Sequence, residues 1–500
     1  MTAGGWSDAA EVLGADLHLE LTGAGSRRAV LIRALREAVR SGRLEPGTRL
    51  PPYRSLAADL GLARNTVADA YAELVAEGWL TSRQGSGTRV AHGAVAPEPG
   101  AGAGIGAGSA WAGVGAGSAW AGVGAGAARA GVPGGLPEAV PYDLVQGKPD
   151  PAAFPRAAWL AAARRALTAA PHEAFGIGDP RGRVELRHAL AGYLARVRGV
   201  RTSPDRIVVC SGAAHALRLL ARTVPGPWAV ESYGLPFHRG LLAEAGVLTR
   251  PVAVDEGGVD VGRLPGGVGA VLLTPAHQFP TGGPLLPDRR ASVLDWARET
   301  GGLVVEDDYD GEFRYDRRPV GVLQGLAPDR TVLIGSVSKS LSPALRIGWM
   351  VLPAPLVDEV VAAKGEREPY SSATEQLTLA DFLVSGAYDR HVRRMRRHHR
   401  GRRDRLVAVL AERVPRVRVT GVAAGLHAVV ELPAGTERAA VGAAARHGVA
   451  VEGLGDYRHP EAGGAARADG LVVGYATPPE RLYGAALDAL CAALREALDA

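Results

Sequence analysis

A glycine- and alanine-rich repeat divides this 500-residue chain. The nonapeptide GAGSAWAGV occurs at 106–114 and again unchanged at 115–123, and GAGAARAGV at 124–132 differs from it at two positions. Copies this short and this poor in large apolar side chains carry no amphipathic helix face and cannot stack into a core. Glycine at this density also makes ordering entropically costly. The repeat therefore predicts a flexible linker over 93–140, which excludes one continuous domain.

The linker separates a short unit at 26–92 from a large unit at 141–500, and residues 1–25 form an N-terminal extension. With 47% hydrophobic residues, the chain can bury a sizeable core. Two cysteines supply neither a disulfide framework nor a four-cysteine metal site. We find no signal peptide and no apolar run long enough to cross a bilayer. The sequence predicts a cytoplasmic protein that does not contact a membrane.

The short unit is predicted to contain three helices and a hairpin. Ser26 can cap a helix that runs to Ser41, and a second helix from Leu56 ends at Gly61. A third helix extends from Thr66 to Glu77, with apolar side chains at helical spacing. Residues 79–90 then alternate around a Gly-Ser-Gly tip, as a β-hairpin does. This order is that of a winged helix-turn-helix.

The charge of this unit indicates a nucleic-acid partner. Residues 26–90 hold eleven arginines and six acidic residues, and such a basic module attracts phosphate. In a winged helix-turn-helix, the third helix enters the major groove and the wing lies along the minor groove. A plain three-helix bundle with solvated arginines is the alternative, and the ordered helices, turn and wing disfavour it. The predicted DNA-contacting residues are Arg54, Arg64, Asn65, Thr66, Gly85 and Gly87.

The large unit alternates apolar, strand-like runs with helical stretches, which predicts an α/β domain. Ligands of such folds bind at the carboxyl ends of the strands, and polar clusters follow several of these runs. The predicted strands lie within 206–212, 227–232, 270–275, 303–310 and 331–336.

Lys339 is one of three lysines in a chain that otherwise uses arginine as its cation. Arginine stays protonated, whereas lysine can lose its proton and attack an aldehyde. Ser336, Ser338 and Arg346 surround this lysine in the sequence. The pattern indicates that Lys339 forms a Schiff base with pyridoxal 5′-phosphate (PLP), whose phosphate the other three residues bind. For the segment taken alone, a surface lysine in a serine-rich turn is the alternative.

Two further segments are consistent with PLP. The EDDYD cluster places Asp307 where a carboxylate can hold a proton on the pyridine nitrogen, and Tyr309 where it can bond the ring oxygen. A Mg²⁺ site is the alternative, but no phosphate-cradling P-loop precedes the cluster. The backbone N–H groups around Ala213 and Ala214 can bind the phosphate, although an ordinary strand-to-helix turn has the same pattern. We predict no metal site.

The segments quoted above resemble one family. Residues 35–90 resemble the DNA-binding domain of GntR-type regulators, with one departure at Ala63, where that family usually has a helix-capping serine. Five segments of the large unit complete a resemblance to the MocR-type subfamily of GntR regulators. They are QGKPDPAAFPRAAW (146–159), GIGDPRGRVELR (176–187), TPAHQFPTG (274–282), EDDYDGEFRY (306–315) and SVSKSLSPALRIGW (336–349).

The resemblance implies a fold type I aminotransferase-like domain with a mainly parallel sheet, PLP as the cofactor, and a homodimer, expected to be head-to-tail. Two winged helices would then bind a repeated operator in double-stranded DNA, and PLP or a small amino compound would be the effector. A flexible linker of this length has an end-to-end distance of about 35–40 Å. The sensor is therefore expected to act by docking the heads rather than by rigid leverage.

Departures from working aminotransferases favour a regulator over an enzyme. Phe279 stands where catalytic relatives have an asparagine, and Leu235 where a cofactor-stacking aromatic is expected, with Tyr233 or Phe237 as substitutes. The alternatives are an active PLP-dependent aminotransferase with an accessory DNA-binding domain, and a regulator that has lost PLP. Arg458 is the candidate for binding an effector carboxylate, or else a surface loop residue.

The arginine-rich run at 390–405 predicts a long solvated helix, with a secondary DNA contact as the alternative.

Overall fold

The computed structural model describes residues 19, 21, 26–40, 43–44, 47–76, 79–83, 87–91, 141–264, 266–315, 321–365, 371–463 and 468–499. The predicted linker at 93–140, nearly all of the extension at 1–25, and Gly85 lie outside the described residues. Within the described part of the chain, no helix is both long and apolar enough to span a bilayer.

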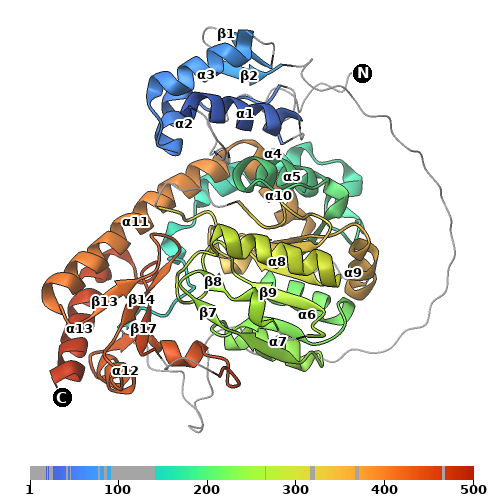
Figure 1. The fold of residues 1–500 in the computed structure, drawn as a ribbon. Coiled ribbons are helices and arrows are strands. Elements are labelled where there is room, and N and C mark those ends of the chain that lie inside the picture. Colours follow the sequence, from blue (N-terminus) through green and yellow to red (C-terminus); the bar gives the residue numbers. More distant parts are fainter. Residues whose placement is uncertain are drawn as a thin grey trace.

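The N-terminal unit, called the head below, is three helices and a two-stranded antiparallel hairpin (Figure 1). Its core packs Leu35 of the first helix against Leu56 and Val67 of the next two, and Val90 of the hairpin closes it. This is the predicted winged helix-turn-helix. Its elements are α1 (Arg27–Arg40), α2 (Tyr53–Leu60), α3 (Arg64–Ala76), β1 (Leu80–Arg83) and β2 (Gly87–Val90).

Two helices of the head begin earlier in the sequence than predicted. The second helix begins at Tyr53 rather than Leu56, because Pro52 precedes it with φ −53° and ends the extended chain there. The third begins at Arg64 rather than Thr66, and the Ala63 carbonyl accepts the Thr66 N–H at 3.0 Å. Ser26 caps α1 as predicted, since its Oγ accepts the Ala29 N–H at 3.3 Å.

The large domain is built on a seven-stranded sheet of order β4-β12-β11-β10-β9-β5-β6. Only β12 runs antiparallel to its neighbours, so the sheet is mainly parallel as predicted. The strands are β4 (Ile207–Cys210), β5 (Trp228–Glu231), β6 (Thr249–Val252), β9 (Ala270–Leu273), β10 (Leu303–Asp307), β11 (Thr331–Ser336) and β12 (Gly348–Val351).

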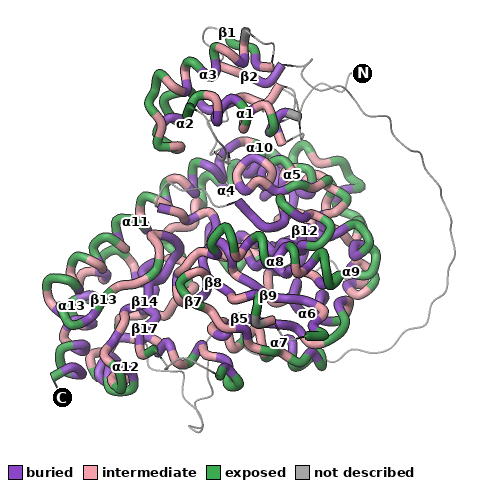
Figure 2. The backbone as a smooth tube through the Cα atoms, viewed as in Figure 1, coloured by how far each residue is buried: buried purple, intermediate pink, exposed green. Residues whose placement is uncertain are grey.

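Helices cover both faces of this sheet, so its central strands are buried on both sides (Figure 2). Alternation along β4 shows the division: Val208 packs toward α6, α7 and α9, whereas Val209 packs toward α5 and α10. Helix α8 covers the second face farther along the sheet. These helices are α5 (Val184–Arg198), α6 (Ala213–Thr223), α7 (Pro236–Glu244), α8 (Pro287–Thr300), α9 (Leu356–Lys364) and α10 (Ala373–Val384).

A smaller C-terminal unit packs a four-stranded antiparallel sheet of order β13-β14-β17-β16 against three helices. Its first helix continues from the large domain, and the short strands β3 (Tyr142–Asp143) and β15 (Val449–Ala450) pair beside it. Helix α4 (Arg156–Ala169) packs against α10 of the large domain. The remaining elements are α11 (Ala387–Arg413), α12 (Glu437–Arg446), α13 (Glu480–Asp499), β7 (Val254–Asp255), β8 (Gly258–Val259), β13 (Arg418–Thr420), β14 (His427–Glu431), β16 (Glu452–Gly453) and β17 (Gly470–Gly474).

Candidate functional site

The carboxyl ends of the central strands open onto one cavity of ≈ 250 Å³. Strand register brings the segments together: Ser336 at the end of β11 pairs with Gly348, and Gly348 pairs with Cys210 at the end of β4. Asp307 ends β10, the next strand along. All eight residues predicted to hold the cofactor line this cavity. They are Ala213, Ala214, Asp307, Tyr309, Ser336, Ser338, Lys339 and Arg346.

Lys339 is half-buried, and its Nζ donates a hydrogen bond to the carbonyl oxygen of Gly147. Burial lowers the pKa of Lys339, while the carboxylates of Asp307 and Asp310 act in the opposite direction. A lysine whose charged form is disfavoured in this way spends more time as the neutral, nucleophilic amine. The surface-lysine alternative is wrong for this structure, because the amine lies inside the cavity.

Asp307 occupies the floor of the same cavity. Burial, and next the charge of Asp308, raise its pKa to about 7. His238 Nδ1 lies 3.9 Å from Asp307 Oδ2, and burial lowers the pKa of that imidazole to about 4, so it stays neutral. Asp307 therefore lacks a cationic histidine as its partner, and its carboxylate is suited to a positively charged group in the cavity.

One end of the cavity is shaped to receive an anion. Gly212 (φ 112°) precedes the first turn of α6, where the N–H groups of Ala213 and Ala214 come before the first helical acceptor, while the His215 N–H donates to the Gly212 carbonyl oxygen at 3.1 Å. A side chain on Gly348 would come within 2.7 Å of the Gly212 Cα, so glycine is required for the two segments to approach. Arg346 is the one described non-glycine residue with positive φ (52°), and its guanidinium lines the same cavity. A backbone conformation that costs roughly 1–2 kcal/mol is consistent with a binding role.

The remaining wall of the cavity carries the aromatic residues. Phe279 faces the Tyr309 ring edge-on, with ring centroids 5.8 Å apart. Leu235, Tyr233 and Phe237 line the cavity as well. Both candidate substitutes for the missing stacking aromatic are thus within the site.

The acids of the EDDYD cluster have separate partners. Glu306 accepts the backbone N–H groups of Leu323 and Gln324, and Asp308 forms an ion pair with Arg198 at 2.6 Å. Only Asp307 of these three lines the cavity. The carboxylates consequently do not converge on one point, which argues against the magnesium alternative.

The predicted effector residue Arg458 is not among the residues that line the cavity. Its guanidinium donates to the Ala462 carbonyl oxygen at 2.5 Å. Arg239 lines the cavity instead, and its guanidinium is held by the backbone carbonyls of Gly234 (2.8 Å) and Tyr457 (3.2 Å). These carbonyl oxygens carry no net charge, so the positive charge of Arg239 is left for an anionic ligand.

Besides Arg239, sequence reasoning missed four polar residues of the cavity, namely Gln146, Glu231, His238 and Thr274. Glu231 is buried with a pKa raised to about 7 by burial, and it accepts hydrogen bonds from the Thr274 N–H and hydroxyl. Glu231 ends β5 and Thr274 directly follows β9, and both strands were predicted. Their position at the carboxyl edge of the sheet could therefore have identified them as cavity residues. His238 and Gln146 had no such signal, because α7 and the loop after β3 reach the cavity only through tertiary packing.

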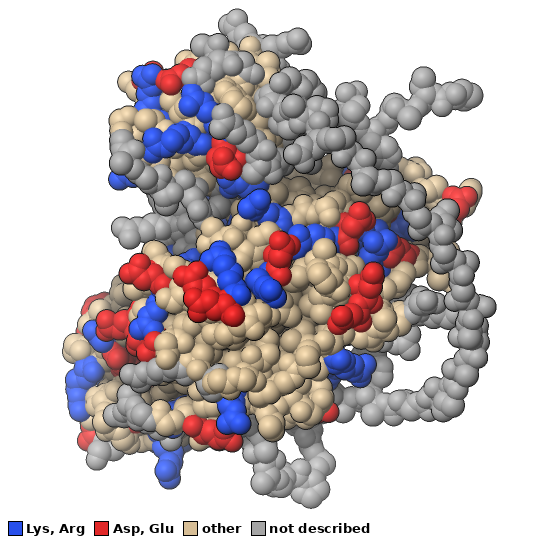
Figure 3. Space-filling model, turned by 45° about the vertical axis from the view of Figure 1, so that its right-hand side comes forward, with Lys and Arg blue, Asp and Glu red and all other residues tan. Residues whose placement is uncertain are grey.

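The predicted DNA-contacting residues of the head lie on its surface. Arg54, Arg64 and Asn65 are exposed and Thr66 is half-buried, the last three in the first turn of α3. Figure 3 shows lysine and arginine side chains exposed on the head, with a few acidic side chains among them, and both charge types are also mixed on the larger domain. Gly87 begins β2 with φ 83°, and a side chain there would meet Arg49 at 2.9 Å.

The arginine-rich run is a long helix, α11, but it is not simply solvated. Arg402 is 3% exposed, lies 4.2 Å from the centre of the Tyr483 ring, and donates to the Ala476 carbonyl oxygen at 2.8 Å. His391 and His399 are also buried. The prediction overlooked this because one face of the helix is buried through arginine stems and histidines rather than through aliphatic residues.

Two family profiles match the chain. "Bacterial regulatory proteins, gntR family" matches residues 28–90, and "Aminotransferase class I and II" matches residues 143–461. The pyridoxine biosynthesis regulator PdxR of Corynebacterium glutamicum is 33% identical over 90% of this chain and 92% of its own length. The probable rhizopine catabolism regulator MocR of Rhizobium meliloti is 32% identical over 76% of both chains. The regulator TauR of Rhodobacter capsulatus is 36% identical over 76% of this chain and 79% of its own.

Solved structures share the fold of the large domain. Kynurenine aminotransferase from Pyrococcus horikoshii has a TM-score of 0.65 and 24% identity, covering 73% of this chain and 93% of that one. An archaeal alanine:glyoxylate aminotransferase has a TM-score of 0.64 and 23% identity, covering 71% and 91%.

Proposed function

This chain belongs to the MocR-type branch of the GntR transcriptional regulators, and from that premise we propose that its aminotransferase-like domain senses PLP, or an amino compound that reacts with bound PLP, and thereby controls operator binding by the head. Regulation rather than turnover is the activity that the relatives support. The observation that carries the proposal is the convergence of all eight predicted cofactor residues on one cavity.

The cavity fits PLP at each of its chemical groups. When bound, PLP supplies an aldehyde for an amine and an electron-accepting ring. Lys339 offers a cavity-lining amine with a lowered pKa, and Asp307 offers a carboxylate for the ring nitrogen. The first turn of α6 and the Arg346 guanidinium offer donors for the phosphate.

The effector is proposed to be PLP itself or a small amine. The Corynebacterium relative is named for pyridoxine biosynthesis and the Rhizobium relative for rhizopine catabolism, so both classes have support among the relatives. Where the amine carries a carboxylate, we propose that Arg239 binds it in preference to Arg458, because Arg239 lines the cavity. A cytoplasmic head-to-tail homodimer with two heads on a repeated operator completes the proposal, supported by the resemblance and by the shared fold.

The test follows the visible absorption band of lysine-bound PLP together with operator binding, in wild type and in Lys339→Ala, across a panel of amines. The proposal expects a band in wild type alone and an operator affinity that changes with PLP or with one amine. A band that persists in the variant, or operator binding that ignores PLP and every amine, would contradict it. Multiple turnover with an amino donor and a keto acid would establish the aminotransferase alternative.

A further inference from the structure

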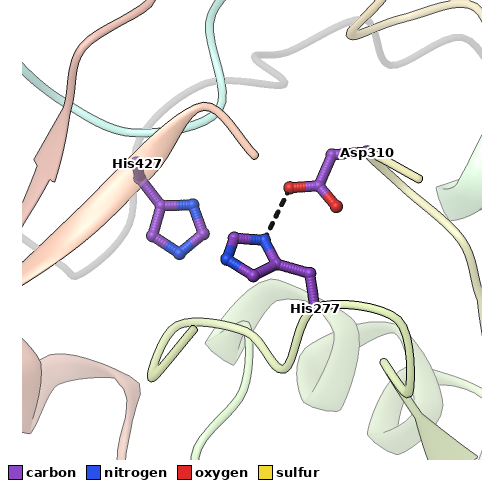
Figure 4. Close-up of side chains that lie close together, drawn as sticks. All are labelled: His277, Asp310 and His427. Carbon is purple, nitrogen blue, oxygen red and sulfur yellow. Dashed lines mark hydrogen bonds and ion pairs between the residues drawn. The ribbon is translucent and has the colours of Figure 1, made fainter. Parts of the chain in front are cut away.

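Behind the cavity wall lies a buried cluster that the proposed function does not use. His277, Asp310 and His427 are 2%, 2% and 3% exposed, and one ligand-type atom from each lies within 4.8 Å of the others. They come from three separate segments: the loop after β9, the turn after β10, and the first residue of β14 (Figure 4). Such burial of polar groups is costly unless each one is paired.

The hydrogen bonds of the cluster lead to Tyr309, which lines the cavity. His277 Nδ1 lies 2.8 Å from Asp310 Oδ2 and 3.0 Å from the Tyr309 hydroxyl oxygen. The Tyr309 hydroxyl donates to the His277 carbonyl oxygen, also at 3.0 Å. Both oxygens around Nδ1 are thus acceptors for one proton, and the carboxylate fixes that proton on Nδ1.

The C-terminal unit closes the cluster without adding charge. The His427 ring packs 5.1 Å from the His277 ring, and its Nε2 bonds the Pro280 carbonyl oxygen at 3.1 Å. Burial, and next the neighbouring His277, lower the pKa of His427 to about 3, so it stays neutral. A side chain on Gly425 would approach Asp310 Oδ2 to within 2.4 Å. The Asp310–His277 pair is therefore tightly enclosed.

Resting on the proposed function, we propose that Asp310 and His277 form a positioning dyad for Tyr309. Asp310 holds a proton on His277 Nδ1, and that single N–H is shared between the Asp310 carboxylate and the Tyr309 oxygen in a bifurcated hydrogen bond. The phenol O–H is then free to turn from the His277 carbonyl to an acceptor in the cavity, the phenolic oxygen of PLP. The side chain of Phe279, which faces Tyr309, has no donor, so it cannot share this role with the Tyr309 hydroxyl.

The experiment titrates the visible band of PLP-loaded protein against pH. A donor to the phenolic oxygen stabilises its anion, so Tyr309→Phe is expected to move the midpoint upward by about one pH unit, the size of one hydrogen bond. His277→Leu is expected to do the same. The double variant is expected to move no further, because His277 acts through Tyr309. His277→Asn keeps an N–H near the Nδ1 position and is expected to restore most of the wild-type midpoint.

Controls separate this role from mere packing. His399 lies on α11 and is buried against Phe313. His399→Leu is expected to leave the midpoint unchanged. Should His277→Leu not fold, Asp310→Asn removes the charge that fixes the proton and is expected to shift the midpoint in the same direction.

Three results would overturn the dyad. The first is an unchanged midpoint in His277→Leu, and the second is shifts that add in the double variant. The third is one zinc ion per chain in purified wild type, since a cation would take the lone pairs that the dyad uses. A wild type that forms no band with PLP would overturn the proposed function itself, and this inference with it.

Discussion

The head and the cavity use their charged residues in opposite ways. On the head, Arg54 and Arg64 are exposed, and a polyanion can reach them from solution. In the cavity, Lys339 is half-buried and Asp307 is buried, and loss of solvent shifts the pKa of each in the direction that favours its neutral form. Exposed cations give graded, salt-dependent attraction to any DNA, whereas buried groups demand one partner of the right shape and charge. One region is therefore suited to binding a polymer and the other to recognising a small molecule.

A comparison of Lys339 with Lys364 should give the largest effect. Lys364 Nζ is held by the carbonyl oxygens of Pro180 (2.5 Å) and Val209 (2.7 Å) and does not line the cavity, whereas Lys339 does. Lys339→Met should abolish the visible band and leave the fold intact. Lys364→Met should keep the band. It should lower the melting temperature by several degrees, because leaving the two buried carbonyl oxygens without a donor costs ~1–3 kcal/mol of folding free energy.

The measurement for this pair is borohydride reduction of the PLP-loaded protein followed by peptide mapping. Label found on Lys364 or Lys148 would break the assignment of the cofactor lysine.

Arg64→Ala should produce the second-largest effect, and it should change operator binding alone. Loss of a contact from the first turn of α3 should weaken operator binding by about 1–3 kcal/mol, or roughly tenfold to a hundredfold, with the PLP band unchanged. Fluorescence anisotropy at several salt concentrations measures it. Arg418→Ala is the matched control, since Arg418 is 76% exposed on β13 and paired with Glu431. Equal losses in both variants would show that the head is not the specific DNA surface.

Asp307→Asn tests the cavity side through pH. The carboxyl has a pKa near 7 when folded against an ordinary 3.8, so the folded chain binds its proton more tightly between about pH 4 and 7. Its contribution to stability is therefore present at low pH and lost as pH rises through that window. Without PLP, the variant should melt about 2 °C above wild type at pH 8, with the difference vanishing toward pH 4. Calorimetry showing the reverse order at pH 8 would contradict the burial argument.

The smallest effect is expected at the start of the recognition helix. Ala63 precedes α3 and accepts the Thr66 N–H through its carbonyl, but its side chain caps nothing. Ala63→Ser should add ~1 kcal/mol of local stability, or about fivefold slower amide exchange in the first turn of α3. Hydrogen-exchange mass spectrometry measures this. Exchange that stays unchanged would mean that the first turn of α3 is not limited by its missing cap.

Much of this molecule was predictable because local patterns coincide with the functional parts. Gly61 ends α2, and the strands that end at Asp307 and Ser336 place their polar residues at one sheet edge. Arg239 and His238 were missed because α7 brings them into the cavity by packing that no local pattern reveals. The buried face of α11 was missed for another reason, because arginine stems and histidines rather than aliphatic side chains form it. The Asp310–His277 pair joins residues 33 positions apart and needed the structure itself.

Coupling between the two regions is the central claim, and thermodynamic linkage tests it most directly. If PLP changes operator affinity by some factor, operator DNA must change PLP affinity by the same factor. The measurement is a PLP titration of wild type, followed by its visible band, with and without saturating operator. The account predicts two displaced curves whose ratio of Kd values equals the ratio found for operator binding with and without PLP. Superimposed curves, at a cofactor site that binds normally, would contradict it.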